Sequence, residues 1–240
     1  MSLPGWQALH EELEPKGLTV ATVAIDVRPE DTFKWIDAAS PTHPSLIDTG
    51  HVVDEQFGFL NIPMALWIDE SGTIVRPAEA ATIEPSPFRT MDVPEGLPER
   101  LDRTLREVKT MPDQAEEYRA AIVDWVEKGS ESRFALSPEE VVARSQPRST
   151  DHATAAAYFE LGEHALRVHG KDAAVPFWRE AHRLYPENWT YKRQAWTLET
   201  TPEGQDNDLL QGPNDAYDGN WLDDFIAGGG GMRYSVNPDL

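Results

Sequence analysis

Four side chains near residue 50 are of the types that bind divalent metals. His43, Asp48, His51 and Asp54 lie within the stretch THPSLIDTGHVVD. Imidazole nitrogens and carboxylate oxygens are ordinary ligands of zinc and related ions, so these four are the candidate metal ligands of the chain. The same positions also suit a turn over 40–44, a short extended segment over 45–48 and a short helix over 51–58, and we expect no resident metal or other cofactor.

A basic spot near residue 192 is the candidate anion site. Lys192, Arg193 and Trp196 stand together in NWTYKRQAW, within a chain that has 42 acidic and 21 basic residues. Cationic side chains of this kind can hold a carboxylate or a phosphate. They can equally pair with acidic side chains on the protein's surface or form an interface, and these alternatives to anion binding stay open. Farther upstream, His164 and His182 are expected to be solvated or interfacial.

Several nucleophile and nucleotide motifs are missing from the sequence. The chain has no cysteine, so disulfides, thiolate nucleophiles and cysteine zinc sites are excluded for the chain as written. It contains no P-loop, no G-x-G-x-x-G and no Ser-His-Asp pattern with a nucleophile elbow. The acidic pair Asp69-Glu70 continues into Ser-Gly and indicates a hairpin turn rather than an acid–base pair. Whether the chain is an enzyme stays open.

The composition excludes some classes of partner. A formal net charge of −21 argues against nucleic acid and against anionic membrane surfaces, both of which need clustered Lys and Arg. No window approaches 18 apolar residues, so we expect no membrane span. The start MSLPGWQALHEEL has no basic stretch followed by an apolar run, so we expect no signal peptide and a cytoplasmic protein, provided that Met1 is the true start.

The residues around position 70 predict a β-hairpin preceded by a proline. In NIPMALWIDESGTIVR, a strand over 64–68 is followed by a tight turn and a second strand over 73–76. Upstream, the pattern predicts helices over 6–13, 29–39 and 51–58, and strands over 18–25 and 45–48. This alternation predicts an α/β domain with a mixed sheet over residues 1–96.

From residue 97 the apolar spacing becomes helical. Helices are predicted over 97–109, 114–128, 137–145 and 189–199, the third with Ser137 as its N-cap. Residues 152–186 resemble one tetratricopeptide repeat. The positions that match its spacing are Tyr158, Leu161, Gly162, Ala174, Trp178, Ala181 and Pro186. We therefore predict an all-α, tetratricopeptide-like domain over 97–199, with a generic helical hairpin as the alternative.

The last predicted segment, residues 200–240, mixes aromatic and acidic residues with a run of four glycines. Glycine runs are flexible, but the aromatic residues on either side indicate a tail that is tied down. Tyr217, Trp221 and Tyr234 are candidate interface residues, since aromatic side chains often anchor protein interfaces. Their alternative role is to attach the tail to its own domain.

Residues 3–77 resemble the thioredoxin-like thiol–disulfide oxidoreductases and redoxins of the TlpA/ResA type. The resemblance lies in LPGWQALHEELEPKGLTVATVAIDV and in the stretch from DTFKW to WIDESGTIVRP. It implies a thioredoxin-like mixed sheet and makes Pro63 the family's cis-proline, with Ile62 and Met64 flanking it in a groove that holds an extended substrate. An ordinary trans proline that opens a strand is the alternative.

The resemblance breaks at the family's active site. Its CxxC precedes "LP", here Leu3-Pro4, so the active-site turn and the central strand would lie upstream of Met1. Without that strand the sheet centre would hold unpaired backbone groups. A second copy of the chain, the C-terminal tail or a partner would fill the gap. Alternatively, the true start lies upstream of Met1. An in-frame stop codon that is read as selenocysteine is one way in which such a start could be hidden.

Three functions are consistent with these features. The first is a cysteine-free, non-redox thioredoxin-like protein that binds a protein partner or assembles, as a homodimer or larger complex. The second is a thiol–disulfide oxidoreductase of the TlpA/ResA type whose CxxC or selenocysteine lies upstream of Met1. The third is an enzyme with non-thiol chemistry in the groove beside Pro63. We expect the first for the chain as written.

Overall fold

The computed structural model describes residues 3–86, 90–145, 147–199, 215–216, 219–231, 236–237 and 240. The chain is a mixed α/β protein with small sheets, and it forms two compact units. The first unit comprises Met1–Ser86, Asp113–Gln146 and Ser235–Leu240, and the second comprises Pro87–Pro112 and Pro147–Tyr234. Because the units interleave along the chain, each is described by itself.

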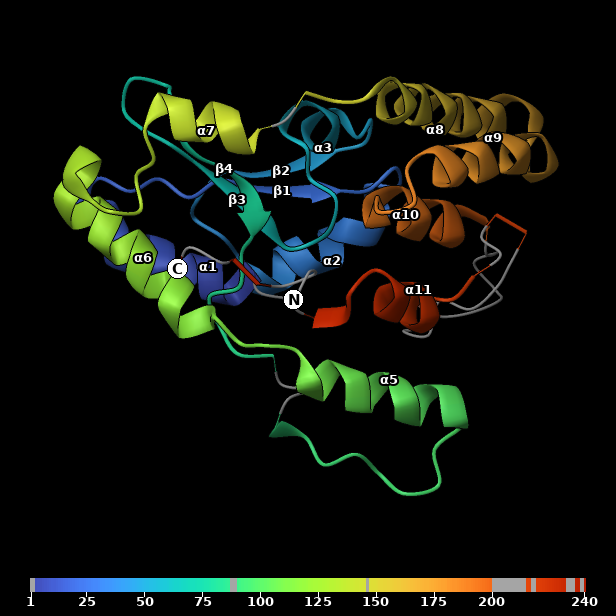
Figure 1. Ribbon diagram of the computed structural model, residues 1–240, viewed down its shortest axis with the longest axis horizontal. Coiled ribbons are helices and arrows are strands. Elements are labelled where there is room, and N and C mark those ends of the chain that lie inside the picture. Colours follow the sequence, from blue (N-terminus) through green and yellow to red (C-terminus); the bar gives the residue numbers. More distant parts are fainter. Residues whose placement is uncertain are drawn as a thin grey trace. The chain divides into compact units, whose positions relative to one another are not determined.

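The strands of the first unit form two separate two-stranded sheets (Figure 1). In the first sheet, β1 (Thr22–Ile25) runs parallel to β2 (Ser45–Asp48). In the second, β3 (Met64–Ile68) and β4 (Ile74–Ala80) form an antiparallel hairpin with an irregular register around Trp67. The hairpin turn is held by the Asp69 carboxylate, which accepts hydrogen bonds from the backbone of Ser71 and Thr73, both at 2.9 Å.

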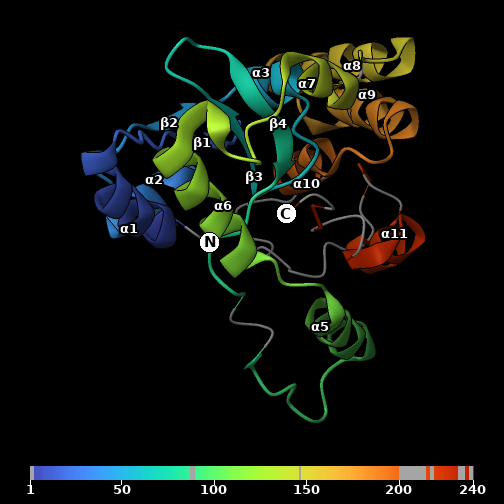
Figure 2. The ribbon, with the colours of Figure 1, turned by 60° about the vertical axis from the view of Figure 1, so that its left-hand side comes forward.

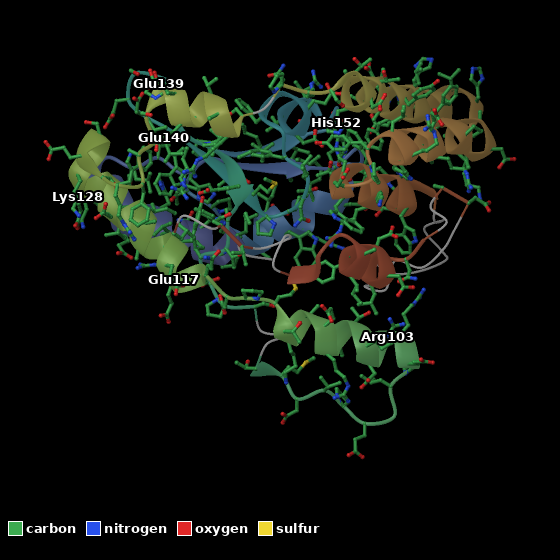
Figure 3. The ribbon with its side chains drawn as sticks, viewed as in Figure 1. Arg103, Glu117, Lys128, Glu139, Glu140 and His152 are labelled. Carbon is green, nitrogen blue, oxygen red and sulfur yellow. The ribbon has the colours of Figure 1, made fainter. Side chains whose placement is uncertain are left out.

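The α-helices of the first unit come from two stretches of the chain, residues 1–86 and 113–146. They are α1 (Leu3–Leu13), α2 (Glu30–Ala39), α3 (Val52–Phe57), α6 (Ala115–Lys128) and α7 (Pro138–Arg144). At the start of α7, Ser137 and Glu140 form the reciprocal hydrogen bonds of a capping box. Glu139 lies beside Glu140 in this first turn (Figure 3), where carboxylates interact favourably with the helix dipole.

The apolar core of the first unit is built around Trp67 on β3. Its ring stacks on Trp125 of α6 at 5.0 Å between centroids, and its indole N–H donates to the Tyr118 hydroxyl at 3.0 Å. Leu9 and Leu13 bring the buried side of α1 into the same cluster. All four residues of β1 are only half-buried and none belongs to this cluster, so the β1–β2 sheet is less enclosed than the hairpin.

The second unit is helical over its described residues. It contains α5 (Glu99–Thr110), α8 (Thr150–His169), α9 (Lys171–Leu184), α10 (Trp189–Glu199) and α11 (Trp221–Ala227). Helices α8 and α9 lie side by side in both ribbon views (Figures 1 and 2). They approach closely because Gly162 faces the fully buried Trp178, whose ring would lie 2.4 Å from any Cβ at that position.

The sequence-based prediction of elements is largely confirmed. Each predicted helix and strand up to residue 199 has a counterpart, including the Ser137 N-cap. β1 begins at Thr22 rather than at residue 18, because the Leu18 amide instead donates to the last turn of α1. α6 and α7, which were grouped with the later helices, belong to the first compact unit. The domain bounds 1–96, 97–199 and 200–240 stay a prediction.

Candidate functional site

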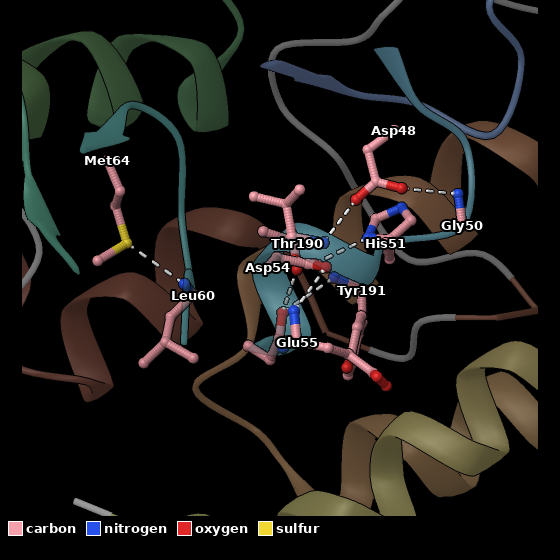
Figure 4. A network of polar contacts seen from close by, with 11 residues as sticks. Asp48, Gly50, His51, Asp54, Glu55, Leu60, Met64, Thr190 and Tyr191 are labelled. Atoms are coloured by element: carbon pink, nitrogen blue, oxygen red, sulfur yellow. Dashed lines mark hydrogen bonds and ion pairs between the residues drawn. The ribbon is translucent and has the colours of Figure 1, made fainter. Parts of the chain in front are cut away.

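The proline that precedes β3 lies in an exposed apolar segment. The Ile62–Pro63 peptide bond is cis, as the resemblance implies. Ile62 is 50% exposed and Pro63 is exposed beside it. Met64 is half-buried, and its sulfur accepts a hydrogen bond from the Leu60 amide at 3.3 Å (Figure 4). Of the three predicted groove residues, Ile62 and Pro63 are therefore accessible to solvent, and Met64 is partly covered.

The outer edge of β1 offers backbone groups to a further strand. The amides of Thr22 and Asp26 donate to Pro44 and Asp48, on the β2 side, at 2.9 and 3.2 Å. Because neighbouring residues in a strand alternate in direction, the N–H and C=O groups of Val23 and Ile25 face the opposite edge. Among the described residues, β1 pairs with β2 alone.

The edge of β3 is open in the same way. The Pro63 carbonyl accepts a hydrogen bond from the Ala81 amide at 3.1 Å, so Pro63 faces β4. The backbone of Met64, one residue later, faces away from β4. In the part of the chain that the structure describes, no strand but β4 pairs with β3. Among the described residues, each of the two small sheets of the first unit therefore has an unpaired strand edge, at β1 and at β3.

His43 belongs to a buried hydrogen-bond network rather than to a metal cluster. Its Nδ1 lies 2.9 Å from Gln7 Oε1, and its Nε2 lies 3.1 Å from the hydroxyl of Thr22. The amide oxygen of Gln7 can only accept, so Nδ1 carries the proton in this arrangement. Burial, followed by the nearby His10, lowers the pKa of His43. The network joins α1 to the start of both strands of the first sheet.

The other three candidate metal ligands form local contacts (Figure 4). The Asp48 carboxylate accepts hydrogen bonds from the amides of Gly50 and Val53, at 3.1 and 2.7 Å. His51 Nδ1 lies 2.9 Å from Asp54 Oδ2, and both side chains are buried. Within the described ranges, no three His, Asp or Glu side chains gather closely enough to hold a metal ion.

The three residues of the predicted basic spot differ in burial, because they lie on different sides of α10. Lys192 and Trp196 are buried, whereas Arg193 is half-buried. The ammonium of Lys192 lies 3.3 Å from the Asp224 carboxylate and 4.6 Å from the ring centroid of Trp189. Lys192 lines a cleft in the second unit.

The cleft has a volume of about 730 Å³. Its ionisable lining residues are Arg179, Glu180, His182, Arg183, Lys192 and Asp224, with Pro176 and Ala216 among the others. Burial, followed by the positive charge of Lys192, lowers the pKa of His182 to about 4, and Arg179 acts in the same direction. Hydrogen bonds to the backbone of Tyr191 and Ala216 act in the opposite direction.

The cleft residues Arg179 and Asp224 were missed from the sequence. Arg179 stands three residues before His182 on α9, a helical spacing that marks one face of the helix. That signal was available, but nothing local connects Asp224, in α11, to Lys192 in α10. Of the candidate interface residues, Tyr217 and Tyr234 lie outside the described residues, and only the backbone of Trp221 is described, at the start of α11.

The comparisons with known proteins add no family. Neither the family models, nor the curated proteins, nor the solved structures that were searched match the chain. No helix in the described ranges combines the length and the apolar character that a membrane span requires.

Proposed function

We propose that the chain is a cysteine-free, thioredoxin-like protein that binds a partner polypeptide, and that its first unit does so by accepting a β-strand. The observation that carries this proposal is the pair of open edges on β1 and β3. Exposed strand edges are templates for pairing with another chain, and strand addition is a common mode of peptide recognition. In this proposal the strand lies between β1 and β3.

The half-burial of β1 supports the same proposal. A strand inside a parallel sheet is normally covered on both faces, and its side chains are then apolar and buried. The sequence of β1, TVAI, suits such a position, but its four residues are only half-buried. We therefore expect the incoming strand to be apolar. The exposed Ile62 and Pro63 form the adjoining contact for the extended chain that follows that strand.

The second unit supplies a helical surface in this proposal. Its α8–α9 hairpin and α10 are taken as a tetratricopeptide-like element, for which the Gly162–Trp178 contact is the main support. Such repeats bury their faces by stacking on neighbouring helices. The proposed protein is thus a two-part assembly module, and we propose that it works as a homodimer or in a larger complex.

A substitution in β1 tests the proposal. The Val23 amide faces the open edge, so Val23→Pro removes a donor from that edge and leaves the bonds to β2 in place. Val23→Ala is the matched control, because it shortens the side chain and keeps the N–H. In protein isolated in its native complex, we expect the amides of Val23 and Ile25 to be protected from hydrogen exchange, and Val23→Pro to abolish complex formation. Rapid exchange at both amides in the complex contradicts the proposal.

A second candidate function is a thiol–disulfide or selenol oxidoreductase of the TlpA/ResA type. The same open edges favour it, since the central strand of that family is followed directly by its active-site turn. It requires residues upstream of Met1 with a cysteine or a selenocysteine. Intact mass and N-terminal peptide mapping of the protein from its native host separate the two functions. A start at Met1 or Ser2 supports the binding function, and an earlier start with either residue supports the oxidoreductase.

A further inference from the structure

The outer face of α8 carries a regular row of exposed side chains. Its members are Ala157, Leu161, His164 and Val168, all of them exposed, with Leu161 at 48% and Val168 at 57%. Their spacing of four, three and four residues is that of the apolar seam of a coiled coil. In an α-helix this spacing places all four within about 60° of one another around the axis. We call these four residues the α8 seam.

The opposite face of α8 is already packed inside the second unit. Gly162 lies against the buried ring of Trp178 on α9, and the buried ring of Phe159 stacks on Tyr191 of α10 at 4.4 Å between centroids. A surface helix normally places its apolar residues on one face and polar residues on the other. Because α8 has apolar side chains on both faces, the seam is a second surface suited to packing.

One acidic and one basic side chain flank the seam on the same side. They are Glu160 and Arg167, which are both exposed and lie seven residues apart in α8. Seven residues span about 10.5 Å of helix, so the two cannot pair closely with each other. Neither forms a hydrogen bond or an ion pair with another residue of the described ranges. This flank is therefore neutral in total, although the whole chain carries −21.

The seam matches a second copy of itself that runs in the opposite direction. A two-fold interface is self-complementary: if one residue contacts another across it, the symmetry repeats the contact. With Leu161 opposite His164 of the second copy, Ala157 falls opposite Val168. Each small side chain then faces a larger one, as close packing requires.

The same antiparallel register also pairs the flanking charges. Glu160 lies on the same side of the pair as Arg167 of the second copy, offset by two residues or about 3 Å along the axis. The two-fold axis repeats this contact, so both charges of each copy find an opposite charge. A parallel pair would instead place Glu160 beside Ala165, which has no charge. Charge complementarity therefore selects the antiparallel arrangement and a second copy as the occupant.

We propose that the α8 seam is the interface through which two copies of the chain form an antiparallel, two-fold symmetric dimer. This inference rests on the proposed function in that the protein assembles with itself, and it does not depend on strand acceptance by the first unit. The seam covers only about two heptads, and small interfaces form weak complexes. We expect a dissociation constant of about 10–100 µM.

The test is analytical ultracentrifugation of the full chain from about 1 µM to about 1 mM, a range that brackets the expected dissociation constant. The wild type should change from monomer to dimer over this range. Leu161→Gln should weaken the dimer at least about tenfold, because it places an amide in the seam. Val142→Gln is the matched control: Val142 is 71% exposed on α7 of the first unit, and its replacement should change the affinity less than about twofold.

Charge reversal tests the register. Glu160→Arg and Arg167→Glu should each weaken the dimer at least about fivefold, because like charges then face one another. General repulsion between acidic chains predicts something else: Glu160→Arg makes the chain less negative and would strengthen association, and Arg167→Glu would weaken it. An equimolar mixture of the two variants should restore the affinity to within about twofold of the wild type, because each copy then meets the opposite charge.

Three outcomes overturn the proposal. The first is a wild-type chain that stays monomeric up to about 1 mM. The second is a dimer that Leu161→Gln leaves unchanged, which would show that the copies meet at another surface and would leave the proposed homodimer standing. The third is opposite effects of the two charge reversals with no restoration in the mixture, which would show a dependence on net charge alone. Strand acceptance is tested separately at Val23, in the other unit, so its failure is distinguishable from each of these.

Discussion

Acidification is expected to destabilise the second unit through His182. This side chain is 9% exposed on α9, and burial together with Lys192 and Arg179 lowers its pKa to about 4. An unfolded histidine has a pKa of about 6.5, so between these values the unfolded state binds a proton that the folded state does not. The stabilising effect is complete above pH 6.5 or so, falls as the pH falls, and is gone near pH 4.

The pKa difference gives the size of the effect. A fall from about 6.5 to about 4 corresponds to about 3 kcal/mol of unfolding free energy, of which about 2 kcal/mol is lost between pH 7 and pH 5. The assay compares urea unfolding of the wild type and of His182→Gln at pH 7, 6 and 5. The stability of the wild type relative to the variant should fall by about 2 kcal/mol over this range, whatever the variant's stability at pH 7.

The control for this prediction is His164→Gln. His164 is exposed on α8 in the same unit, so its replacement removes no buried group. It should leave the pH dependence of unfolding as in the wild type. A stability difference between wild type and His182→Gln that stays constant from pH 7 to pH 5 would refute the reasoning. So would an imidazole titration of His182 by NMR with a midpoint near 6.5.

Three further predictions concern stability and are checked by urea unfolding. Arg76 is 1% exposed and pairs with Glu79, so Arg76→Met should cost about 3 kcal/mol by leaving a largely buried carboxylate without its cation, and Glu79→Gln should cost a comparable amount by leaving the buried guanidinium without its carboxylate. Gly162→Val should lower the free energy of unfolding by about 2 kcal/mol or more, because the new Cβ would overlap the Trp178 ring. An equal loss for a valine placed at an exposed position of α8 would contradict this cause. Asn237→Ala should cost about 1 kcal/mol, since the side chain donates to the Ala80 carbonyl at 2.6 Å, and no change would show that this contact is dispensable.

The structure identifies which residues attach the C-terminal tail, which the sequence did not. The aromatic residues around the glycine run indicated a tail that is tied down. The structure shows such an attachment at other residues: Asn237 exchanges backbone hydrogen bonds with the Gln114 side chain, at 2.6 and 3.0 Å, and Leu240 packs on the core of the first unit. Asparagine and leucine carry no local signal for such a contact, so the sequence alone did not identify them.

The features that the sequence determined are local ones. The capping box of Ser137 and Glu140, the Asp69 turn and the small residue at Gly162 act within a few residues or through a repeating face of a helix. Periodicity and capping chemistry depend on neighbours in the chain. For that reason the order of helices and strands up to residue 199 could be predicted without the structure.

Only the tertiary structure decided which distant side chains meet. His43 was a candidate metal ligand, yet the fold places it against Gln7, 36 residues away, where it accepts and donates hydrogen bonds. Lys192 was one of three residues in a basic spot, yet the helix buries it and turns it toward Arg179 and Asp224 in one cleft. A side chain's direction depends on how its helix or strand packs. Local sequence patterns predict the helix or strand, but the partners that bury one of its faces come from elsewhere in the chain.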